Sequence, residues 1–262
     1  MDSTNHRSGQ ILGVSVDAVA AGDVAGRLID AIHQSDRAEH IVTYNPEYAM
    51  AARRDRAFRD AIGNAYLTTA DGVGIVLAAR LHRHAPPLER ITGVDLLGMM
   101  AQASPETGAG IFLLGAGPDV APRAAAAIKK LHPNANFSGW WWGGTPKPSD
   151  DAATIERIRD SGASMLAVAY GAPAQIHWIA RNREALSQIG IRIVVGVGGA
   201  LDYWAGEAKR PPELIRKLGL EWLFRLVREP WRWRRQLVLP GFAVLATIEA
   251  ARTWLPRKPR IE

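Results

Sequence analysis

The stretch Met165–Gln175, with the sequence MLAVAYGAPAQ, decides the fold class. Its first five residues are apolar without interruption, which is typical of a strand that is buried on both faces. Gly171 follows the strand, and Pro173 precedes a helical segment that runs through Trp178. A continuous apolar strand, a glycine turn and a helix together predict one unit of a parallel α/β sheet.

The same unit recurs on both sides of this stretch. An apolar strand at Gly110–Leu114 precedes a glycine turn and an Ala-rich helix, and another at Ile191–Val195 precedes Gly196–Gly199. The first half of the chain also alternates, with strands predicted at Ile11–Val16, His40–Tyr44 and Ala65–Thr68 and helices at Val24–Gln34 and Glu47–Ile62. We therefore predict an α/β fold with Rossmann-like parallel-sheet layers and helices on both faces.

The composition changes near residue 205, where we place a domain boundary. Residues 206–262 contain thirteen Lys/Arg and six Asp/Glu, a net charge of +7, whereas the whole chain has a net charge of +6. The body is therefore close to neutral, and the tail is basic. We predict a flexible N-terminus over residues 1–10, an α/β catalytic domain over residues 11–205 and a C-terminal helical, basic appendage over residues 206–262.

Several classes of protein are excluded by composition. The chain has no cysteine, which rules out disulfides, thiolate metal sites and cysteine nucleophiles and fits a reducing cytoplasm. The first thirty residues carry no apolar run typical of a signal peptide. The longest apolar stretch near the C-terminus, Leu237–Ile248, is interrupted by Pro240 and Gly241 and is too short to span a bilayer. We expect a chain that is soluble or lies on a membrane surface.

Three glycine turns follow predicted strands, at the edge where open α/β sheets bind ligands. They contain Gly115 and Gly117, Gly171, and Gly198 with Gly199. Glycine allows close backbone approach, and helix N-terminal N–H groups attract phosphate. A single turn of this kind is as easily a plain strand-to-helix connection, but three together favour a diphosphate ligand.

A nicotinamide dinucleotide is the main alternative ligand for the Gly115 turn. The dinucleotide fingerprint requires a third glycine, and position 120 is Val. It also requires an acidic residue about twenty positions later, and Asn134–Phe137 offers none. Both departures disfavour NAD.

Asp71 is the candidate general base, because it follows a predicted strand and precedes Gly72. Taken alone, the same Asp is more simply a cap for the next helix. Thr43 and Asn45 can bond a sugar hydroxyl or Asp71, although Asn45 before Pro46 is also typical of a helix N-cap.

Three further polar residues are candidates for substrate binding. Arg90 can pair with a diphosphate or with Asp71, or form a surface ion pair of little consequence. Gln175 lies in the first turn of its helix and is expected to point into the crevice. Asp202 is expected to hold a uridine or ribose hydroxyl.

No metal site and no cofactor are predicted. The chain has no Asp-x-Asp motif to carry a divalent ion, and its seven histidines are scattered. Trp140–Trp142 is either the end of a core strand or, as the less favoured reading, a stacking platform for a base or sugar.

The appendage interleaves arginine with tryptophan, a combination that suits a lipid headgroup interface. The arginines are Arg225, Arg228, Arg232, Arg234 and Arg235, and the tryptophans are Trp222, Trp231 and Trp233. The same pattern is compatible with nucleic-acid binding or with a packed helix that has a solvated basic face. The apolar run Leu237–Ile248 favours an anionic membrane surface and not nucleic acid.

Motifs that occur in order along the chain carry a family resemblance. They are Thr43-x-Asn45, Ala70-Asp71-Gly72, Arg90-x-Thr92-Gly93-x-Asp95, Phe112-Leu113-Leu114-Gly115, Gly171-x-Pro173-x-Gln175, Gly196-x-Gly198-Gly199-x-x-Asp202-x-x-Ala205-Gly206, Arg210-x-Pro212 and Glu221-Trp222-Leu223-x-Arg225-Leu226-x-x-Glu229-Pro230-x-Arg232. From about Ile11 to Arg235, the chain resembles the WecG/TagA/CpsF family of bacterial glycosyltransferases.

This resemblance implies an inverting, metal-independent hexosyltransferase that acts at the inner face of the cytoplasmic membrane. Its donor would be a UDP-sugar carrying N-acetylmannosamine or glucose, and its acceptor a polyprenyl-diphosphate-linked sugar used for cell-surface polysaccharide. The resemblance implies that Asp71 is the general base beside Thr43 and Asn45, with Arg90 and Gln175 lining the pocket. It also implies that Asp202 lies on the nucleotide side and that Arg225 and Arg232 reach the lipid diphosphate.

Ile176 departs from the family pattern, which often has Glu after the glutamine. The run of three tryptophans and the long C-terminal end are also unusual, and they leave donor and acceptor choice open. An NAD(P)-dependent oxidoreductase and a non-catalytic membrane or nucleic-acid adaptor are the rival functions. The sequence is compatible with a monomer or a homo-oligomer.

Overall fold

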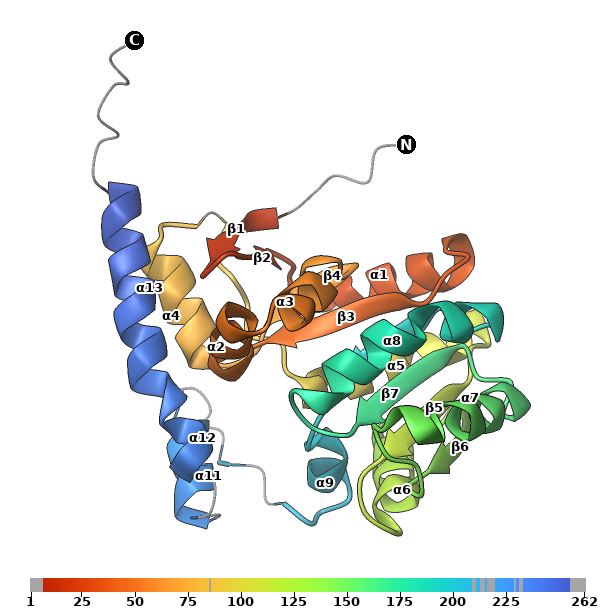
Figure 1. Cartoon of the computed structure of the whole chain (residues 1–262). Helices are drawn as coiled ribbons and strands as arrows, with labels where there is room; N and C mark the ends of the chain where they lie inside the picture. Colours follow the sequence, from red (N-terminus) through yellow and green to blue (C-terminus); the bar gives the residue numbers. More distant parts are fainter. Residues whose placement is uncertain are drawn as a thin grey trace.

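A six-stranded sheet forms the centre of the protein, and every neighbouring pair of its strands is parallel (Figure 1). The computed structural model describes residues 7–84, 86–208, 211–212, 215, 220–228, 230 and 233–254. The strand order is β4-β3-β8-β7-β5-β6. The strands are β3 (Glu39–Tyr44), β4 (Leu67–Ala70), β5 (Ile111–Gly115), β6 (Phe137–Trp141), β7 (Met165–Ala169) and β8 (Ile193–Gly196).

Helices cover both faces of the sheet, because successive residues of each strand point to opposite sides. Leu113, Ala167 and Val195 pack into one core with α1 (Ala21–Gln34), α5 (Gly93–Thr107), α6 (Val120–Leu131) and α9 (Ala200–Trp204). Leu114 and Val168 face the other way, toward α7 (Asp151–Asp160) and α8 (Ala174–Gln188). A short 3-10 helix, η1 (Pro148–Asp150), precedes α7. The predicted layered α/β fold is confirmed.

Two predicted elements are each divided in the structure. The strand predicted at Ile11–Val16 is a hairpin of β1 (Arg7–Ile11) and β2 (Val14–Asp17), because Leu12 and Gly13 both have positive φ and reverse the chain. Residues 7–10, predicted to be flexible, therefore belong to a strand. The helix predicted at Glu47–Ile62 is α2 (Pro46–Arg54) followed by α3 (Arg56–Gly63), since the extended Asp55 ends one and caps the other.

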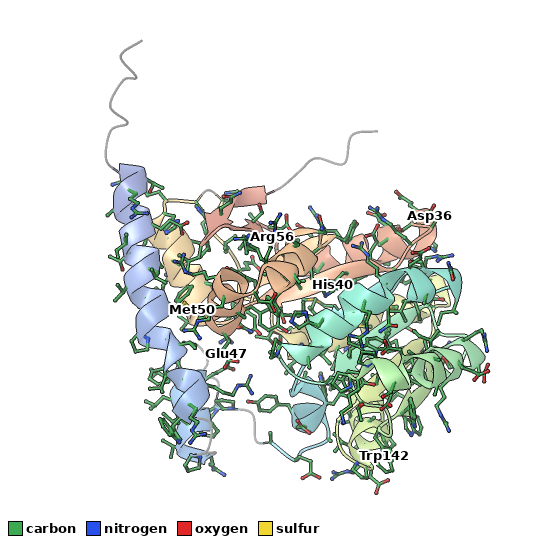
Figure 2. All side chains as sticks on the ribbon, in the orientation of Figure 1. Asp36, His40, Glu47, Met50, Arg56 and Trp142 are labelled. Atoms are coloured by element: carbon green, nitrogen blue, oxygen red, sulfur yellow. The ribbon has the colours of Figure 1, made fainter. Side chains whose placement is uncertain are left out.

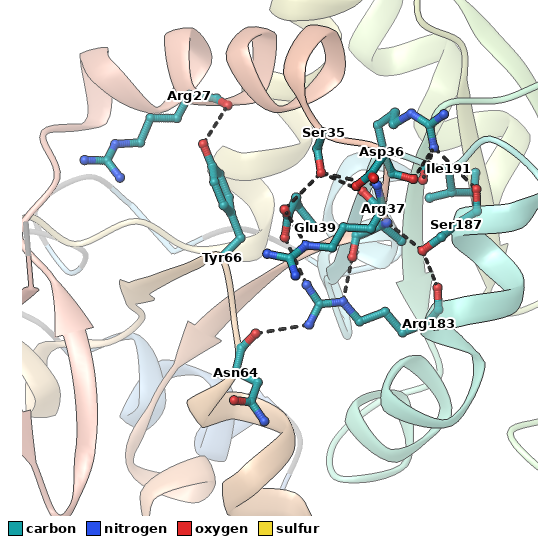
Figure 3. A network of polar contacts seen from close by, with 12 residues as sticks. Arg27, Ser35, Asp36, Arg37, Glu39, Asn64, Tyr66, Arg183, Ser187 and Ile191 are labelled. Carbon is teal, nitrogen blue, oxygen red and sulfur yellow. Dashed lines mark hydrogen bonds and ion pairs between the residues drawn. The ribbon is translucent and has the colours of Figure 1, made fainter. Parts of the chain in front are cut away.

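A partly buried ionic network around Glu39 lies at the amino end of β3 (Figure 3). Arg183 Nη2 donates to Glu39 Oε2 at 2.9 Å, and Arg183 Nε donates to the Ala38 carbonyl at 2.7 Å. His40 follows Glu39 in the same strand, and burial, reinforced by the Arg183 charge, lowers its pKa to about 3. These contacts join α8 to the amino end of β3, and Tyr44 lies at the other end of this strand.

The C-terminal part is helical, as predicted. It contains α11 (Glu221–Arg228), α12 (Trp233–Gln236) and α13 (Val238–Trp254). Helix α13 runs alongside α4 (Val73–Leu81) and packs against α4 and α2, burying Phe242, Ala246 and Ala250 on one face (Figure 1). Among the described residues no helix is long and apolar enough to cross a membrane. The domain boundary near residue 205 stays a prediction.

The tryptophan triplet lies at the edge strand β6 and not in the core. Trp140 and Trp142 are half exposed, whereas Trp141 is partly buried and has Arg157 over its ring at 4.9 Å. Figure 2 labels Trp142. None of the three lines the large cavity described below. The triplet therefore does not serve as a stacking platform within that cavity.

Candidate functional site

A cavity of about 550 Å³ lies at the carboxyl ends of β3, β4, β7 and β8. Thr43 and Asn45 reach it from β3 and the residue after it, Asp71 from the residue after β4, and Gly171 from the turn after β7. Residues of α11, α12 and α13 also line it, so the cavity lies between the sheet and the C-terminal helices. This is the edge of an open α/β sheet at which ligands bind.

The structure brings together eight of the thirteen predicted site residues. Those that line the cavity are Thr43, Asn45, Asp71, Arg90, Gly171, Gln175, Gly198 and Gly199. Gly115, Gly117 and Asp202 do not line it. Arg232 falls outside the described residues, and Arg225 is described only as part of α11.

The expectation that three glycine turns share one cavity is corrected to two. The turn at Gly115 follows β5, which is separated from β3 by both β7 and β8 in the strand order. Gly171 and Gly198 follow β7 and β8, which lie closer to β3. The Gly115 turn is a neighbour of the Gly171 turn, since Gly115 pairs with Ala169, but it does not line the cavity.

Asp71 is held at the cavity by its backbone. Its N–H donates to the Tyr44 carbonyl at 2.7 Å. The preceding residue, Ala70, is held as well, because its carbonyl accepts from the Ile91 N–H at 2.9 Å. The N-cap of α4 is Gly72 and not Asp71, so the reading of Asp71 as the N-cap of this helix is wrong. A half-buried carboxylate in a cavity can accept a proton from a hydroxyl.

Asn45 has the capping role that its position before Pro46 predicts. Its Oδ1 accepts from the Tyr48 N–H at 3.0 Å at the start of α2. The bond uses Oδ1 alone, and the amide NH₂ retains its capacity to donate to a ligand. Thr43 is buried beside it on β3. The two residues therefore flank Asp71 from the neighbouring strand.

Gln175 lies beneath the glycine turns instead of pointing freely into the crevice. Its side chain is 2% exposed, and its Oε1 accepts from the N–H groups of Gly171 and Gly198, each at 3.1 Å. Its Nε2 donates to the Tyr48 hydroxyl at 2.7 Å. A Cβ at Gly196 would lie 2.7 Å from Nε2, so this position requires glycine. Gln175 thus links two loops of the sheet to α2.

Tyr48 is a site residue that sequence reasoning missed. Burial raises the pKa of its hydroxyl, and the Asp71 charge acts in the same direction while the bond from Gln175 opposes them. The hydroxyl therefore stays protonated and neutral beside the carboxylate. Its only signal in the sequence was its position three residues after Asn45.

Two ion pairs connect the body to the C-terminal helices across the cavity. Arg90 Nη1 lies 2.9 Å from Glu221 Oε2 on α11, and Arg235 Nη2 of α12 lies 2.6 Å from Glu47 Oε2 on α2. All four residues line the cavity, and Figure 2 places Glu47 on the side of α2 that faces the C-terminal helices. The cavity thus contains two guanidinium groups that an anionic ligand can bind by displacing a carboxylate.

Among the described residues, no group of three or more His, Asp and Glu side chains could hold a metal ion. The described cavity offers the guanidinium groups of Arg90 and Arg235 as partners for a diphosphate.

Comparison with known proteins identifies a family and a relative. Residues 9–256 match the family model described as Glycosyl transferase WecG/TagA/CpsF family. A protein of Bacillus subtilis (strain 168) is 32% identical over 219 residues, which cover 83% of this chain and 83% of that protein. It is named N-acetylglucosaminyldiphosphoundecaprenol N-acetyl-beta-D-mannosaminyltransferase.

Proposed function

We propose the following substrates and mechanism from the premise that this chain belongs to the WecG/TagA/CpsF family of glycosyl transferases. The chain is a glycosyltransferase, and this decides against the nicotinamide-dependent oxidoreductase and the non-catalytic adaptor. Its proposed reaction transfers N-acetylmannosamine from a UDP-sugar to a polyprenyl-diphosphate-linked N-acetylglucosamine, with glucose as the alternative donor sugar.

The relative from Bacillus subtilis supports the acceptor and the sugar. Its name states a diphosphoundecaprenol-linked acceptor and an N-acetyl-β-mannosaminyl product. Nucleotide donors of this type carry the sugar in α linkage, so a β product requires inversion at the anomeric carbon. Inversion needs one displacement and one base, and Asp71 is the carboxylate that the cavity supplies.

In the proposed step, Asp71 takes the proton from the acceptor hydroxyl as that oxygen forms a bond with the anomeric carbon of the donor. The bond between that carbon and the UDP oxygen breaks, and UDP leaves with the electron pair. Arg90 is the cation that the body of the protein contributes to the described cavity, and it can stabilise this charge. The observation that carries the proposal is that Asp71 lines one cavity together with Arg90 and the turns at Gly171 and Gly198.

The C-terminal helices support a peripheral position on an anionic membrane surface, which we propose to be the inner face of the cytoplasmic membrane. Trp222 and Trp233 are exposed on α11 and α12, and Arg228 and Arg234 lie over aromatic rings of the same helices. Exposed tryptophan and arginine together suit the headgroup region. The enzyme would then reach its lipid-linked acceptor at the membrane that contains it.

The direct test is a turnover assay with UDP-N-acetylmannosamine, UDP-N-acetylglucosamine and UDP-glucose. The acceptor is N-acetylglucosamine on a short polyprenyl diphosphate, and each reaction is run with and without a chelator. We expect the first donor to be used and the chelator to have no effect. Turnover of none of the three donors would contradict the proposed reaction, and loss of turnover in the chelator would contradict the metal-independent mechanism.

A further inference from the structure

One wall of the cavity is apolar and is formed by two helices that lie side by side. Leu77 and Leu81 of α4 are one helical turn apart and therefore share a face of that helix. Leu239, Phe242, Ala243 and Ala246 of α13 follow the same periodicity. We call these six residues the α4–α13 wall.

The α4–α13 wall carries no charge and little polarity. Thr247 is its nearest polar neighbour in the cavity lining, and its hydroxyl already donates to the Ala243 carbonyl at 2.8 Å. Leu77 is 49% exposed and Leu81 is 42% exposed, which is unusual for leucines that line a cavity. Apolar surface in a binding cavity is thus left open to solvent.

Small residues of both helices lie along this wall. On α4, a Cβ at Gly74 would lie 2.9 Å from Pro46, which requires a small residue there, and 3.5 Å from the Phe242 ring, which is ordinary van der Waals contact. Ala243 presents only a methyl group beside Leu239. The helices therefore pack closely through Phe242 and Ala246, and the exposed leucines of α4 border an unfilled strip.

The remainder of the same cavity is polar and contains both guanidinium groups. Arg90 and Arg235 lie with Asp71 in the lining that continues into the α4–α13 wall. A matching ligand has an anionic head and an apolar extension. A nucleotide sugar is polar along its whole length and gains nothing from the wall.

We propose that the α4–α13 wall binds the first isoprene units of the lipid diphosphate acceptor, while its diphosphate lies toward Arg235 of α12, the helix that precedes α13. This inference rests on the proposed function for the identity of the acceptor. It adds that the enzyme holds part of the lipid chain itself, and that the chain leaves the active site along the exposed side of the α4–α13 wall, over Leu77, Leu81 and Ala243.

The test uses soluble probes with one head and a growing tail: dimethylallyl, geranyl and farnesyl diphosphate, which carry one, two and three isoprene units. Their affinities for the full chain are measured by calorimetry without any donor. We expect each added unit to tighten binding by about tenfold, because the wall is half open and burial of five carbons is incomplete. No dependence on chain length in the unmodified protein would overturn the proposal.

Matched substitutions locate the effect. Ala243→Trp fills the strip and should reduce the gain per isoprene unit to less than about twofold. Val244→Trp is the control, since Val244 is the adjacent residue, is 58% exposed and does not line the cavity; it should keep the full gain. Equal chain-length dependence in both variants would place the lipid elsewhere and refute the proposal.

A second variant keeps the test conclusive if Ala243→Trp does not fold. Leu77→Ser removes an exposed side chain at little cost to folding and should weaken farnesyl diphosphate several-fold more than dimethylallyl diphosphate. Unchanged farnesyl affinity in Leu77→Ser would also count against the wall. These binding results are independent of turnover, so a chain-length effect without sugar transfer would uphold the wall and reject the proposed reaction.

Discussion

Replacement of Gln175 by Leu should both destabilise the protein and impair catalysis, because one side chain joins two loops and a helix. The substitution keeps the approximate volume and removes three hydrogen bonds, those from Gly171 N and Gly198 N and that to the Tyr48 hydroxyl. Gln175→Glu is the matched control. It keeps Oε1 as an acceptor, and the Tyr48 hydroxyl can rotate to donate to the second oxygen.

The magnitude follows from the groups left without partners. A buried polar group that loses its partner costs about 1–3 kcal/mol, and water from the adjoining cavity should reduce each loss to the lower limit. Three groups then give about 3 kcal/mol. For a chain of this size, each kcal/mol lowers Tm by about 2–4 °C, so Gln175→Leu should unfold about 6–12 °C lower. Displacement of the turns at the reacting groups should lower kcat/KM by about 10²-fold.

Thermal unfolding and steady-state kinetics measured on the same preparations separate the possibilities. We expect Gln175→Glu to recover most of the stability that Gln175→Leu loses. Tyr48→Phe removes one bond and should cost about 1 kcal/mol. A Gln175→Leu protein with unchanged Tm and a raised donor KM would refute the positioning role and make Gln175 a direct ligand of the substrate.

Three other predictions concern charge. Glu221→Gln releases Arg90 from its carboxylate partner and should lower the KM for the UDP-sugar donor by about two- to fivefold, the range for a partly exposed ion pair. A higher donor KM in kinetic assays would contradict this. Burial keeps His40 neutral in the folded protein down to about pH 3. Below pH 6.5 the unfolded state therefore binds more protons than the folded state. The free energy of unfolding, measured with urea, should fall by up to about 1.4 kcal/mol per pH unit as the pH is lowered from 6.5 to 3. His40→Gln should flatten that slope, and an unchanged slope would assign it to other groups. Arg228→Gln and Arg234→Gln should each weaken binding to anionic vesicles about fivefold in pelleting assays and leave binding to zwitterionic vesicles unchanged; equal loss on both would argue against charge.

The parallel sheet could be predicted because its signal is local. Each buried strand is a short apolar run followed by a glycine turn, so the strands at Met165–Ala169 and Ile193–Gly196 were placed to within two residues. No single segment of the sequence determines the order of the strands across the sheet. The Gly115 turn has the same local sequence features as the Gly171 turn, and only the position of β5 in the sheet separates it from the cavity.

The candidate site was predicted as a set of residues but not as a set of contacts. Thr43 lies at the end of β3, and Asn45 and Asp71 follow the neighbouring strands β3 and β4. Their proximity follows from the carboxyl ends of parallel strands sharing one edge. Arg90 and Glu221 are 131 positions apart, and no spacing rule connects them. The local pattern was wrong for the strand predicted at Ile11–Val16, because Leu12 has a positive φ there and an apolar residue does not indicate a turn.

The central claim is that Asp71 removes the acceptor proton in a direct, metal-independent displacement, and Asp71→Asn tests it most directly. Pre-steady-state turnover should be measured together with binding of UDP and of farnesyl diphosphate. We expect turnover to fall by about 10²–10⁴-fold, with both affinities and Tm close to those of the unmodified protein. Full turnover in Asp71→Asn would contradict the account.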